Sequence, residues 1–333
     1  MIISRTPFRI SFFGGGTDYP VFYEKHGGAV LSTTINKYCY ITCRYLPPFF
    51  DYKYRIRYTQ REETQTISEI RHPSVRECLN FVDLGNQGVE IQHNADLPAM
   101  SGLGSSSAFT VGLLNTLYAL KGELVTKRRL ALDAIKVEQD IIKENVGSQD
   151  QTSAAFGGFN KIEFGGKRNI FVSPITVEQS KLDYLQNHLM LFFTGFPRTA
   201  SEIAAEQIKQ TPKKTKELKA MMEMVEEAVK VLNGSQDGYA DFGKLLHESW
   251  SIKKSLTPHI TNSSIDEIYE AAMSAGALGG KLLGAGGGGF ILFFVKTELQ
   301  RQVKEKLKNL LFVPFAFHDL GSQIVYYAPE NNY

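Results

Sequence analysis

The segment from Leu97 to Phe109 reads "LPAMSGLGSSSAF", so two glycines and four serines stand directly before an apolar stretch. Small residues let a backbone approach a ligand closely, and free N–H groups and hydroxyls can then converge on one point. The start of the following helix adds about half a positive charge there. Residues of these types in this order are suited to bind a group with many oxygens, such as a phosphate.

An ordinary helix cap is the alternative explanation, with Ser105 as the N-cap residue. The segment is not a Walker A loop, because no G-K-[ST] follows its glycines. It is not a G-x-G-x-x-G loop either, because serines follow Gly104. Taken alone, the segment leaves both explanations open.

Two other glycine-rich segments occur, "TPFRISFFGGGTDYP" near the start and "KLLGAGGGGF" near residue 285. In the first, Asp18 follows three glycines and either caps a tight turn or accepts hydrogen bonds from ligand hydroxyls. Arg9 lies inside an otherwise apolar strand and needs an anionic partner there. In the second, five of the six residues from Gly284 to Gly289 are glycine. That number predicts close packing against a ligand or another domain, because a plain turn needs fewer glycines.

Two acids complete the set of residues that could do chemistry. Glu138 shares a helix face with Ala134 and Ile141 and therefore borders the core, although most glutamates on helices are surface carboxylates. Asp150 follows Ser148, a natural N-cap, so the helix dipole favours its ionised form. A first-turn aspartate often has no further role.

These residues are positioned by alternating strands and helices in the first half of the chain. The sequence predicts strands in "ISRTPFRISFF", "AVLSTTINKYCYITCRYL" and "GVEIQHNADL". It predicts a buried helix in "SSAFTVGLLNTLYALKG", ended by Gly122, and an amphipathic helix over 126–147, ended by Gly147. A short helix "QDQTSAAF" and the strand-like "FNKIEFGGKRNIFVSPI" follow.

The second half has a different character. Strand "HLMLFFTG" precedes lysine- and glutamate-rich helices from Ser201 to about Lys254, and a further helix precedes the glycine-rich segment and the buried strand "FILFFV". A helix over 298–311 and short strands end the chain. We expect two domains, residues 1–180 and 181–333, in an α+β arrangement.

The composition limits the possible partners. The net charge is +2 over 333 residues, 43% of which are hydrophobic and 22% charged. This balance predicts a folded chain that binds neither nucleic acid nor a membrane. Cys39, Cys43 and Cys78 lack the spacing of a disulfide framework or a zinc site. The apolar runs are too short for a signal peptide or a membrane span, so we expect a cytoplasmic protein.

Together the three segments resemble the motifs of the GHMP small-molecule kinases, named for galacto-, homoserine, mevalonate and phosphomevalonate kinases. "PFRISFFGGGTDYP" looks like the family's first motif, "LPAMSGLGSSSA" like its second and "KLLGAGGGGF" like its third, in the family order. The resemblance spans nearly the whole chain. It implies an N-terminal ribosomal-protein-S5-domain-2-like domain with a left-handed β-α-β unit, a ferredoxin-like C-terminal domain and a cleft between them.

The resemblance also implies roles for individual residues. Asp150 contacts the reacting hydroxyl with Arg9 beside it, and Ser106 and Glu138 ligate Mg²⁺. Asp18 matches an acid that binds sugar hydroxyls. The residues assigned to the phosphates of ATP are Ser101, Gly102, Leu103, Gly104, Ser105, Ser106 and Ser107, and those assigned to the substrate are Gly15, Gly16, Thr17, Asp18, Gly286 and Gly287.

The expected substrate follows from the first motif. Galactokinases carry Glu-His where this chain has Gly15 and Gly16, which leaves room for a longer sugar. "FGGGTDYP" looks most like the motif of kinases that phosphorylate the anomeric hydroxyl of D-glycero-D-manno-heptose 7-phosphate, in nucleotide-activated heptose synthesis for surface polysaccharide. Arg198 is the first candidate to bind the 7-phosphate, while Lys281 and Arg44 are expected to face solvent.

Two other functions remain open at this point. One is a different anomeric sugar kinase, such as a fucokinase or galactokinase. The other is a catalytically silent sensor of sugar and ATP, although sensing alone does not require the acids. The oligomeric state is also open, with a homodimer as one possibility.

Overall fold

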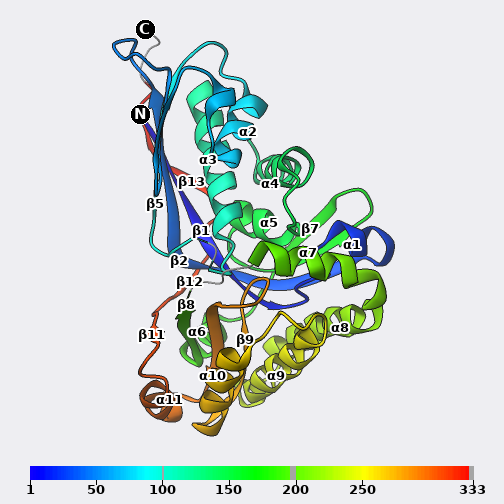
Figure 1. Cartoon of the computed structure of the whole chain (residues 1–333). Coiled ribbons are helices and arrows are strands. Elements are labelled where there is room, and N and C mark those ends of the chain that lie inside the picture. Colours follow the sequence, from blue (N-terminus) through cyan, green and yellow to red (C-terminus); the bar gives the residue numbers. More distant parts are fainter. Residues whose placement is uncertain (100, 196–199, 330–333) are drawn as a thin grey trace.

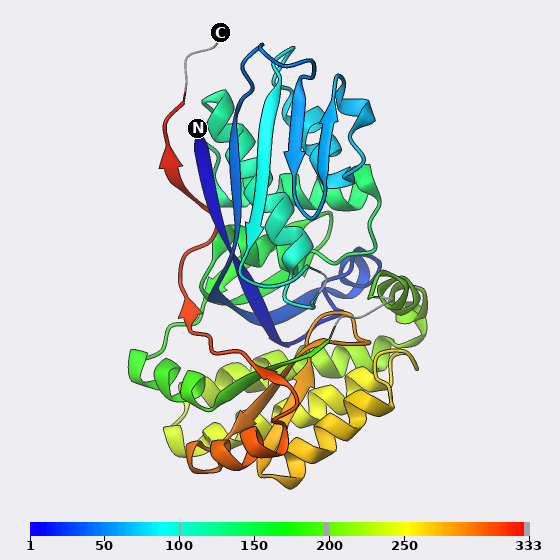
Figure 2. The same cartoon turned by 60° about the vertical axis from the view of Figure 1, so that its left-hand side comes forward.

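The computed structural model describes residues 1–99, 101–195 and 200–329. Within them the strands form two sheets, here called sheet A, with nine strands, and sheet B, with four. Figures 1 and 2 show sheet A in the upper part of the molecule and sheet B in the lower part. Arg198 lies outside the described residues.

Sheet A is built around the long antiparallel pair β1 and β2, in the order β13-β1-β2-β5-β3-β4. β6 and β12 also pair with β2, and β7 pairs with β6. β3 and β5 pair in parallel and are connected through α2 (Pro73–Val82), which makes a β-α-β unit. The strand bounds are β1 Ile2–Phe13, β2 Gly28–Tyr45, β3 Tyr54–Arg57, β4 Arg61–Thr64, β5 Val89–Ala95, β6 Phe159–Gly165, β7 Asn169–Pro174, β12 Phe317–His318 and β13 Gln323–Tyr327.

Helices cover one face of sheet A. α3 (Ser105–Lys121) packs against β1 and β2 and is apolar on nearly every side, because α2, α4 (Lys127–Ile135) and α5 (Gln149–Phe156) enclose it. It ends at Gly122, as predicted, and that residue adopts a left-handed conformation. α1 (Pro20–His26) lies near β6.

Sheet B is antiparallel, in the order β11 (Leu311–Phe312), β8 (Leu189–Gly195), β10 (Gly289–Val295) and β9 (Ala277–Leu282). Alternate residues of β10 enter two different apolar clusters, Phe290, Leu292 and Phe294 on one face and Ile291, Phe293 and Val295 on the other. Both faces of this strand are therefore buried, which explains its unbroken apolar run.

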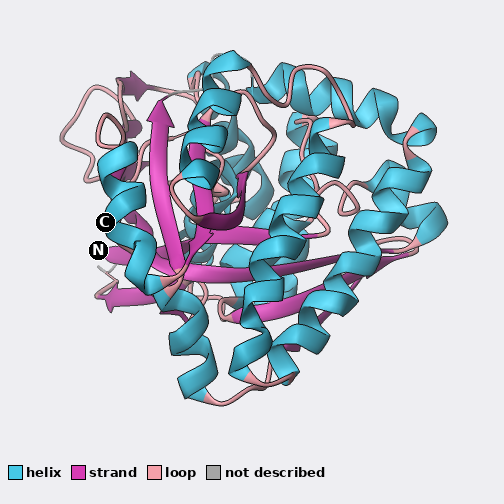
Figure 3. Cartoon of the chain, turned by 90° about the horizontal axis from the view of Figure 1, so that it is seen from below, coloured by secondary structure: helices cyan, strands magenta, loops and turns pink. Residues whose placement is uncertain are grey.

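The helices of the second half pack around sheet B. Seen from below, helices cover much of this end of the molecule (Figure 3). α9 packs against β9 and β10 and also contacts β1, and α8 contacts β1 and β2. The helix bounds are α6 Gln179–Asn187, α7 Ala200–Gln210, α8 Thr215–Asn233, α9 Ala240–Lys254, α10 Ser263–Ser274 and α11 Gln300–Lys306.

The two sheets share one apolar core. The ring of Phe242, in α9, lies 5.4 Å from that of Phe12 and 5.1 Å from that of Phe13, both in β1. β12 and β13 come after all of sheet B in the sequence and yet pair with sheet A. The division at residue 180 stays a prediction, and this pairing shows that the chain crosses between the two sheets more than once.

The helix predicted over 126–147 differs from the structure. α4 ends at Ile135 and continues as a π-helical turn, η2 (Lys136–Ile142), after which Lys143 is left-handed. A π turn changes the angle between successive side chains, so the predicted inward position of Ile141 is wrong and that residue is 38% exposed. π turns are frequent at functional sites. The last helix is also shorter than the predicted 298–311, because the chain extends into β11.

The loop before α3 and the loop after β9 touch backbone to backbone. A Cβ added to Gly102 would lie 2.4 Å from the carbonyl oxygen of Leu283, and one added to Gly284 would lie 2.4 Å from the Cα of Gly102. Phe290 also donates its N–H to the carbonyl of Ser101, at 3.1 Å. Glycine is therefore required where these loops join the two sheets.

We expect Gly102→Ala to lower the free energy of unfolding by about 2 kcal/mol or more, because φ is +86° there and the methyl group would overlap the Leu283 carbonyl. Urea denaturation measures this. Gly165→Ala is the matched control, since a Cβ there meets nothing within 4 Å. Equal effects of the two substitutions would contradict the close contact.

Candidate active site

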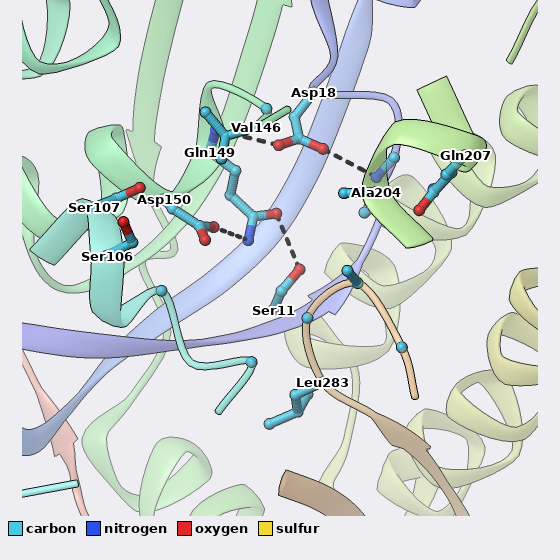
Figure 4. A pocket seen from close by; sticks show the side chains of 18 of the residues that line it. Ser11, Asp18, Ser106, Ser107, Val146, Gln149, Asp150, Ala204, Gln207 and Leu283 are labelled. Atoms are coloured by element: carbon cyan, nitrogen blue, oxygen red, sulfur yellow. Dashed lines mark hydrogen bonds between the residues drawn. The ribbon is translucent and has the colours of Figure 1, made fainter. Parts of the chain in front are cut away.

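A cavity of about 540 Å³ lies between the end of β1, the starts of α3 and α5, and the loop after β9 (Figure 4). All three glycine-rich segments contribute to its wall. Of the residues that the sequence assigned to the site, those lining the cavity are Arg9, Gly15, Gly16, Asp18, Gly102, Gly104, Ser105, Ser106, Ser107, Asp150 and Gly286.

Arg9 and Asp150 form a two-pronged ion pair at this cavity. Arg9 Nε donates to one carboxylate oxygen at 2.8 Å and Nη2 to the other at 2.7 Å, while Nη1 donates to the carbonyl of Gly102 at 2.8 Å. The Arg9 side chain is 6% exposed and that of Asp150 is 28% exposed. The predicted anionic partner of Arg9 is thus Asp150, which keeps one side open to the cavity.

The start of α3 is built from glycine. Gly104 is the N-cap residue in a left-handed conformation, and the helix begins at Ser105, so the alternative with Ser105 as N-cap is wrong. A Cβ on Gly104 would lie 3.3 Å from the Asp150 carboxylate. The backbone N–H groups of the first turn of α3 therefore lie next to Asp150 at one wall of the cavity.

Two residues of this loop do not line the cavity. Ser101 is buried and donates its hydroxyl to the carbonyl of Pro98 at 2.7 Å. Leu103 is buried as well, and its carbonyl accepts the N–H of Arg9 at 3.1 Å. In this structure both residues hold the loop in place.

Glu138 is fully buried in η2, so the alternative of a surface carboxylate is wrong. Its Oε2 accepts from the Ser107 hydroxyl at 2.8 Å and from the Gln151 amide, whereas Oε1 has no hydrogen-bond partner in the part of the chain that the structure describes. Burial raises the pKa of Glu138 to about 7, against the lowering effect of nearby hydroxyl and amide donors. A buried carboxylate oxygen without a donor suits a cation.

The serine that contacts Glu138 is Ser107, while Ser106 is exposed and lines the cavity. Figure 4 shows the two side chains beside Asp150. Among residues 1–99, 101–195 and 200–329, no cluster of three or more His, Cys, Asp or Glu could hold a metal ion. Any metal here would have to take some of its ligands from hydroxyls or from a bound phosphate.

Asp18 caps α5 from outside the helix. Its carboxylate accepts from the N–H groups of Gly16, at 2.9 Å, and Gln149, at 3.3 Å. Ser148 is the N-cap residue by position, but its hydroxyl makes no capping bond to the helix. Burial and, next, the charge of Asp150 raise the pKa of Asp18.

Two assigned substrate residues do not line the cavity. Thr17 is fully buried, and its hydroxyl bonds to the carbonyls of Gly14 and Ala29, so it shapes the turn. Gly287 donates its N–H to the carbonyl of Ile260.

Several cavity residues were missed from the sequence, among them Ser11, Gln149 and Gln207. The Ser11 hydroxyl donates to the Gln149 amide oxygen at 2.9 Å, and the Gln149 amide nitrogen lies 3.4 Å from Asp150 Oδ1. Gln207, in α7, lies against Gly16. Of these three residues, only Ser11 could have been predicted from the sequence. Side chains two apart on a strand share a face, and Arg9 was already a candidate.

The basic residues considered as ligands for the substrate's phosphate do not all lie where the sequence predicted. Lys281 was expected to face solvent, but it is 2% exposed and lines the cavity. The expectation failed because β9 is buried on both faces. Arg44 pairs with Glu90 on β5, away from the cavity lining, as expected of a surface charge. Lys253, which was not predicted, also lines the cavity.

A glycine-serine loop at a helix start, beside an arginine–carboxylate pair that opens into one cavity, defines a phosphotransferase acting on a small molecule. Comparisons with known proteins agree. Residues 73–158 match the family model of the GHMP kinases N terminal domain, and residues 236–311 match that of the GHMP kinases C terminal.

One relative matches almost the whole chain. The D-glycero-alpha-D-manno-heptose 7-phosphate kinase of Campylobacter jejuni is 30% identical over 319 residues, covering 92% of this chain and 93% of the relative. The chain therefore belongs to the GHMP kinases, which use ATP as the phosphate donor.

Solved structures share the fold. A D-glycero-D-manno-heptose 1-phosphate kinase from Bacteroides thetaiotaomicron superposes with a TM-score of 0.77 at 24% identity, covering 98% of this chain and 99% of that one. Lactococcus lactis galactokinase complexed with galactose has a TM-score of 0.72 at 19% identity, covering 97% and 94%. The predicted two-domain GHMP kinase fold is confirmed. Within the described residues, no helix combines the length and apolar character needed to cross a membrane.

We expect Ser107→Ala to lower the free energy of unfolding by about 1–3 kcal/mol, because it removes a donor from the buried Glu138 carboxylate. Ser106→Ala is the matched control, since Ser106 is exposed and its loss should cost less than about 0.5 kcal/mol. Urea unfolding without ligands measures both. A larger loss for Ser106→Ala would show that the wrong serine is paired with Glu138.

Proposed function

We propose that this chain is an ATP-dependent sugar kinase that phosphorylates the anomeric hydroxyl of D-glycero-D-manno-heptose 7-phosphate to give the 1,7-bisphosphate. The single observation that carries the proposal is the Arg9–Asp150 pair, set between the start of α3 and the Asp18 side of one cavity. The named relatives agree on a heptose phosphate but differ in the position of its phosphate group. The choice of the 7-phosphate rests on the Campylobacter relative and on the first motif.

Asp150 is the proposed acceptor of the hydroxyl proton. The sugar oxygen attacks the terminal phosphorus of ATP, the bond from that phosphorus to the bridging oxygen breaks, and ADP leaves. In a loose transition state the proton departs late, so a carboxylate that is a weak base is sufficient. The proton passes from the hydroxyl to Asp150 and then to solvent.

Arg9 is the proposed electrostatic partner of this step. Its two bonds to Asp150 fix the plane of the carboxylate, and its third bond ties it to the carbonyl of Gly102. Gln149 links Ser11 to Asp150 on the other side. The carboxylate is therefore oriented before any substrate binds, which lowers the cost of reaching the transition state.

The nucleotide phosphates are proposed to lie at the start of α3. Gly102 and Gly104 allow close backbone approach, and the backbone N–H groups of the first turn of α3 favour an anion. We propose that the unpartnered Oε1 of Glu138 and the hydroxyl of Ser106 hold Mg²⁺. When bound, Mg²⁺ would neutralise charge on the triphosphate.

The sugar is proposed to lie between Asp150 and Asp18. Asp18 uses its carboxylate to accept two backbone N–H groups and still lines the cavity, so remaining lone pairs can accept from sugar hydroxyls. Gly15 and Gly16 add no side chain of their own to the adjacent wall; Gln207 lies against Gly16, and space remains beside Gly15. This space suits a seven-carbon sugar.

We expect Asp150→Asn to lower kcat by about 10²–10⁴-fold, because asparagine keeps the shape but cannot take the proton. Binding of a non-hydrolysable ATP analogue, measured by calorimetry, should change little. Asp140→Asn is the control, since Asp140 is an exposed carboxylate paired with Arg168. Turnover of Asp150→Asn near that of the control would exclude the proposed role.

A panel of acceptors tests the substrate. The heptose 7-phosphate should give the highest kcat/KM, ahead of the unphosphorylated heptose, fucose and galactose, and nuclear magnetic resonance should place the new phosphate on the anomeric carbon. A higher value for fucose or galactose, or an equal value for the unphosphorylated heptose, would contradict the assignment. An ADP-release assay on the same panel detects a silent sensor, which would release none.

A further inference from the structure

Two buried lysines in the cavity have no part in the mechanism above. Lys253, in α9, is 6% exposed and Lys281, in β9, is 2% exposed, and both line the cavity. Neither forms an ion pair with any residue that the structure describes. A buried ammonium group without an opposing charge is costly, so a chain that keeps two of them at a binding cavity favours an anion there.

Backbone carbonyls accept only half of the N–H bonds of these two lysines. Lys253 Nζ donates to the carbonyls of Leu282, at 3.0 Å, and Gly284, at 2.6 Å. Lys281 Nζ donates to the carbonyl of Phe12 at 2.8 Å. Two ammonium groups have six N–H bonds, so three remain for a ligand. The carbonyls also fix both Nζ atoms in place before a ligand binds.

Burial and the neighbouring positive charges disfavour the charged form of both lysines. Burial and then the charge of Arg9 lower the pKa of Lys253 to about 7, while Asp18 acts in the opposite direction. Burial, Lys253 and Arg9 lower the pKa of Lys281 well below its usual range. Asp150 offers little relief, because both of its oxygens already accept from Arg9. A doubly charged anion would relieve the repulsion.

We propose that Lys253 and Lys281 form a subsite for the phosphate group that the acceptor sugar already carries. The inference rests on the proposed function and deepens it. Lys281 donates to the carbonyl of Phe12, three residues beyond Arg9 on β1, and the charge of Asp18 acts on the pKa of Lys253. The proposed subsite therefore adjoins the side of the cavity where the acceptor sugar is proposed to bind. The donors proposed for the nucleotide phosphates are different groups, the backbone N–H groups in the first turn of α3.

The competing explanation is that the lysines merely brace the loop after β9 or act on the phosphoryl group being transferred. Either role would affect every acceptor equally. A subsite for the acceptor's own phosphate would instead affect phosphorylated acceptors more. The discrimination between two acceptors therefore separates these roles.

The test is the ratio of kcat/KM for the heptose 7-phosphate to kcat/KM for the unphosphorylated heptose, measured for wild type and Lys281→Met. We expect the variant to lower this ratio by about 10- to 100-fold, the effect of losing charge-assisted hydrogen bonds to a phosphate. Lys253→Met should act in the same direction and replaces Lys281→Met if that variant does not fold. Lys244→Met, an exposed lysine on the same helix as Lys253, is the control with an unchanged ratio. An unchanged ratio in both cavity variants would overturn the proposal.

A binding measurement keeps this inference separate from the proposed reaction. Inorganic phosphate is titrated against the protein held with Mg²⁺ and a non-hydrolysable ATP analogue, so that the start of α3 is already filled. Wild type should rise in Tm with phosphate, and Lys281→Met should rise less. If wild type shows this lysine-dependent shift but does not turn over the heptose 7-phosphate, the proposed reaction is wrong and the anion subsite stands. If wild type turns over the heptose 7-phosphate and the shift does not depend on the lysines, the subsite is wrong and the reaction stands.

Discussion

The ion pair between Arg9 and Asp150 is the interaction on which the site depends. It joins β1 to the first turn of α5, and through the third bond of Arg9 it reaches the Gly102 carbonyl in the loop before α3. Three segments far apart in the sequence therefore meet at one guanidinium group. The two bonds from Arg9 set the direction in which the carboxylate faces.

The glycine-rich segments follow from the same requirement. Because the loops before α3 and after β9 touch backbone to backbone, no side chain separates them where the two sheets meet. The shared apolar core, in which Phe242 packs against β1, keeps the two sheets in contact. The arrangement buries three ionisable side chains, Glu138, Lys253 and Lys281, and each bonds to nearby hydroxyls, amides or carbonyls.

Much of the fold was predictable, because strong local signals agree with the final packing. The β-branched and aromatic residues of β1 and the glycine that ends α3 are examples. The helix pattern placed Glu138 at the border of the core, but the exposure of Ile141 was not predictable, since it follows from a π turn after Ile135. Lys253 gave no signal at all, because only the packing of α9 against β9 brings it to the cavity. Residues that act through tertiary contacts between distant segments lie beyond what pattern and spacing can reach.

The most direct test of the account is a crystal structure with a non-hydrolysable ATP analogue, Mg²⁺ and the heptose 7-phosphate bound together. We expect the terminal phosphate at the start of α3, beside Gly104, and the anomeric hydroxyl within about 2.6–3.2 Å of the Asp150 carboxylate. A terminal phosphate bound away from α3, or a sugar whose anomeric hydroxyl points away from Asp150, would contradict the central claim.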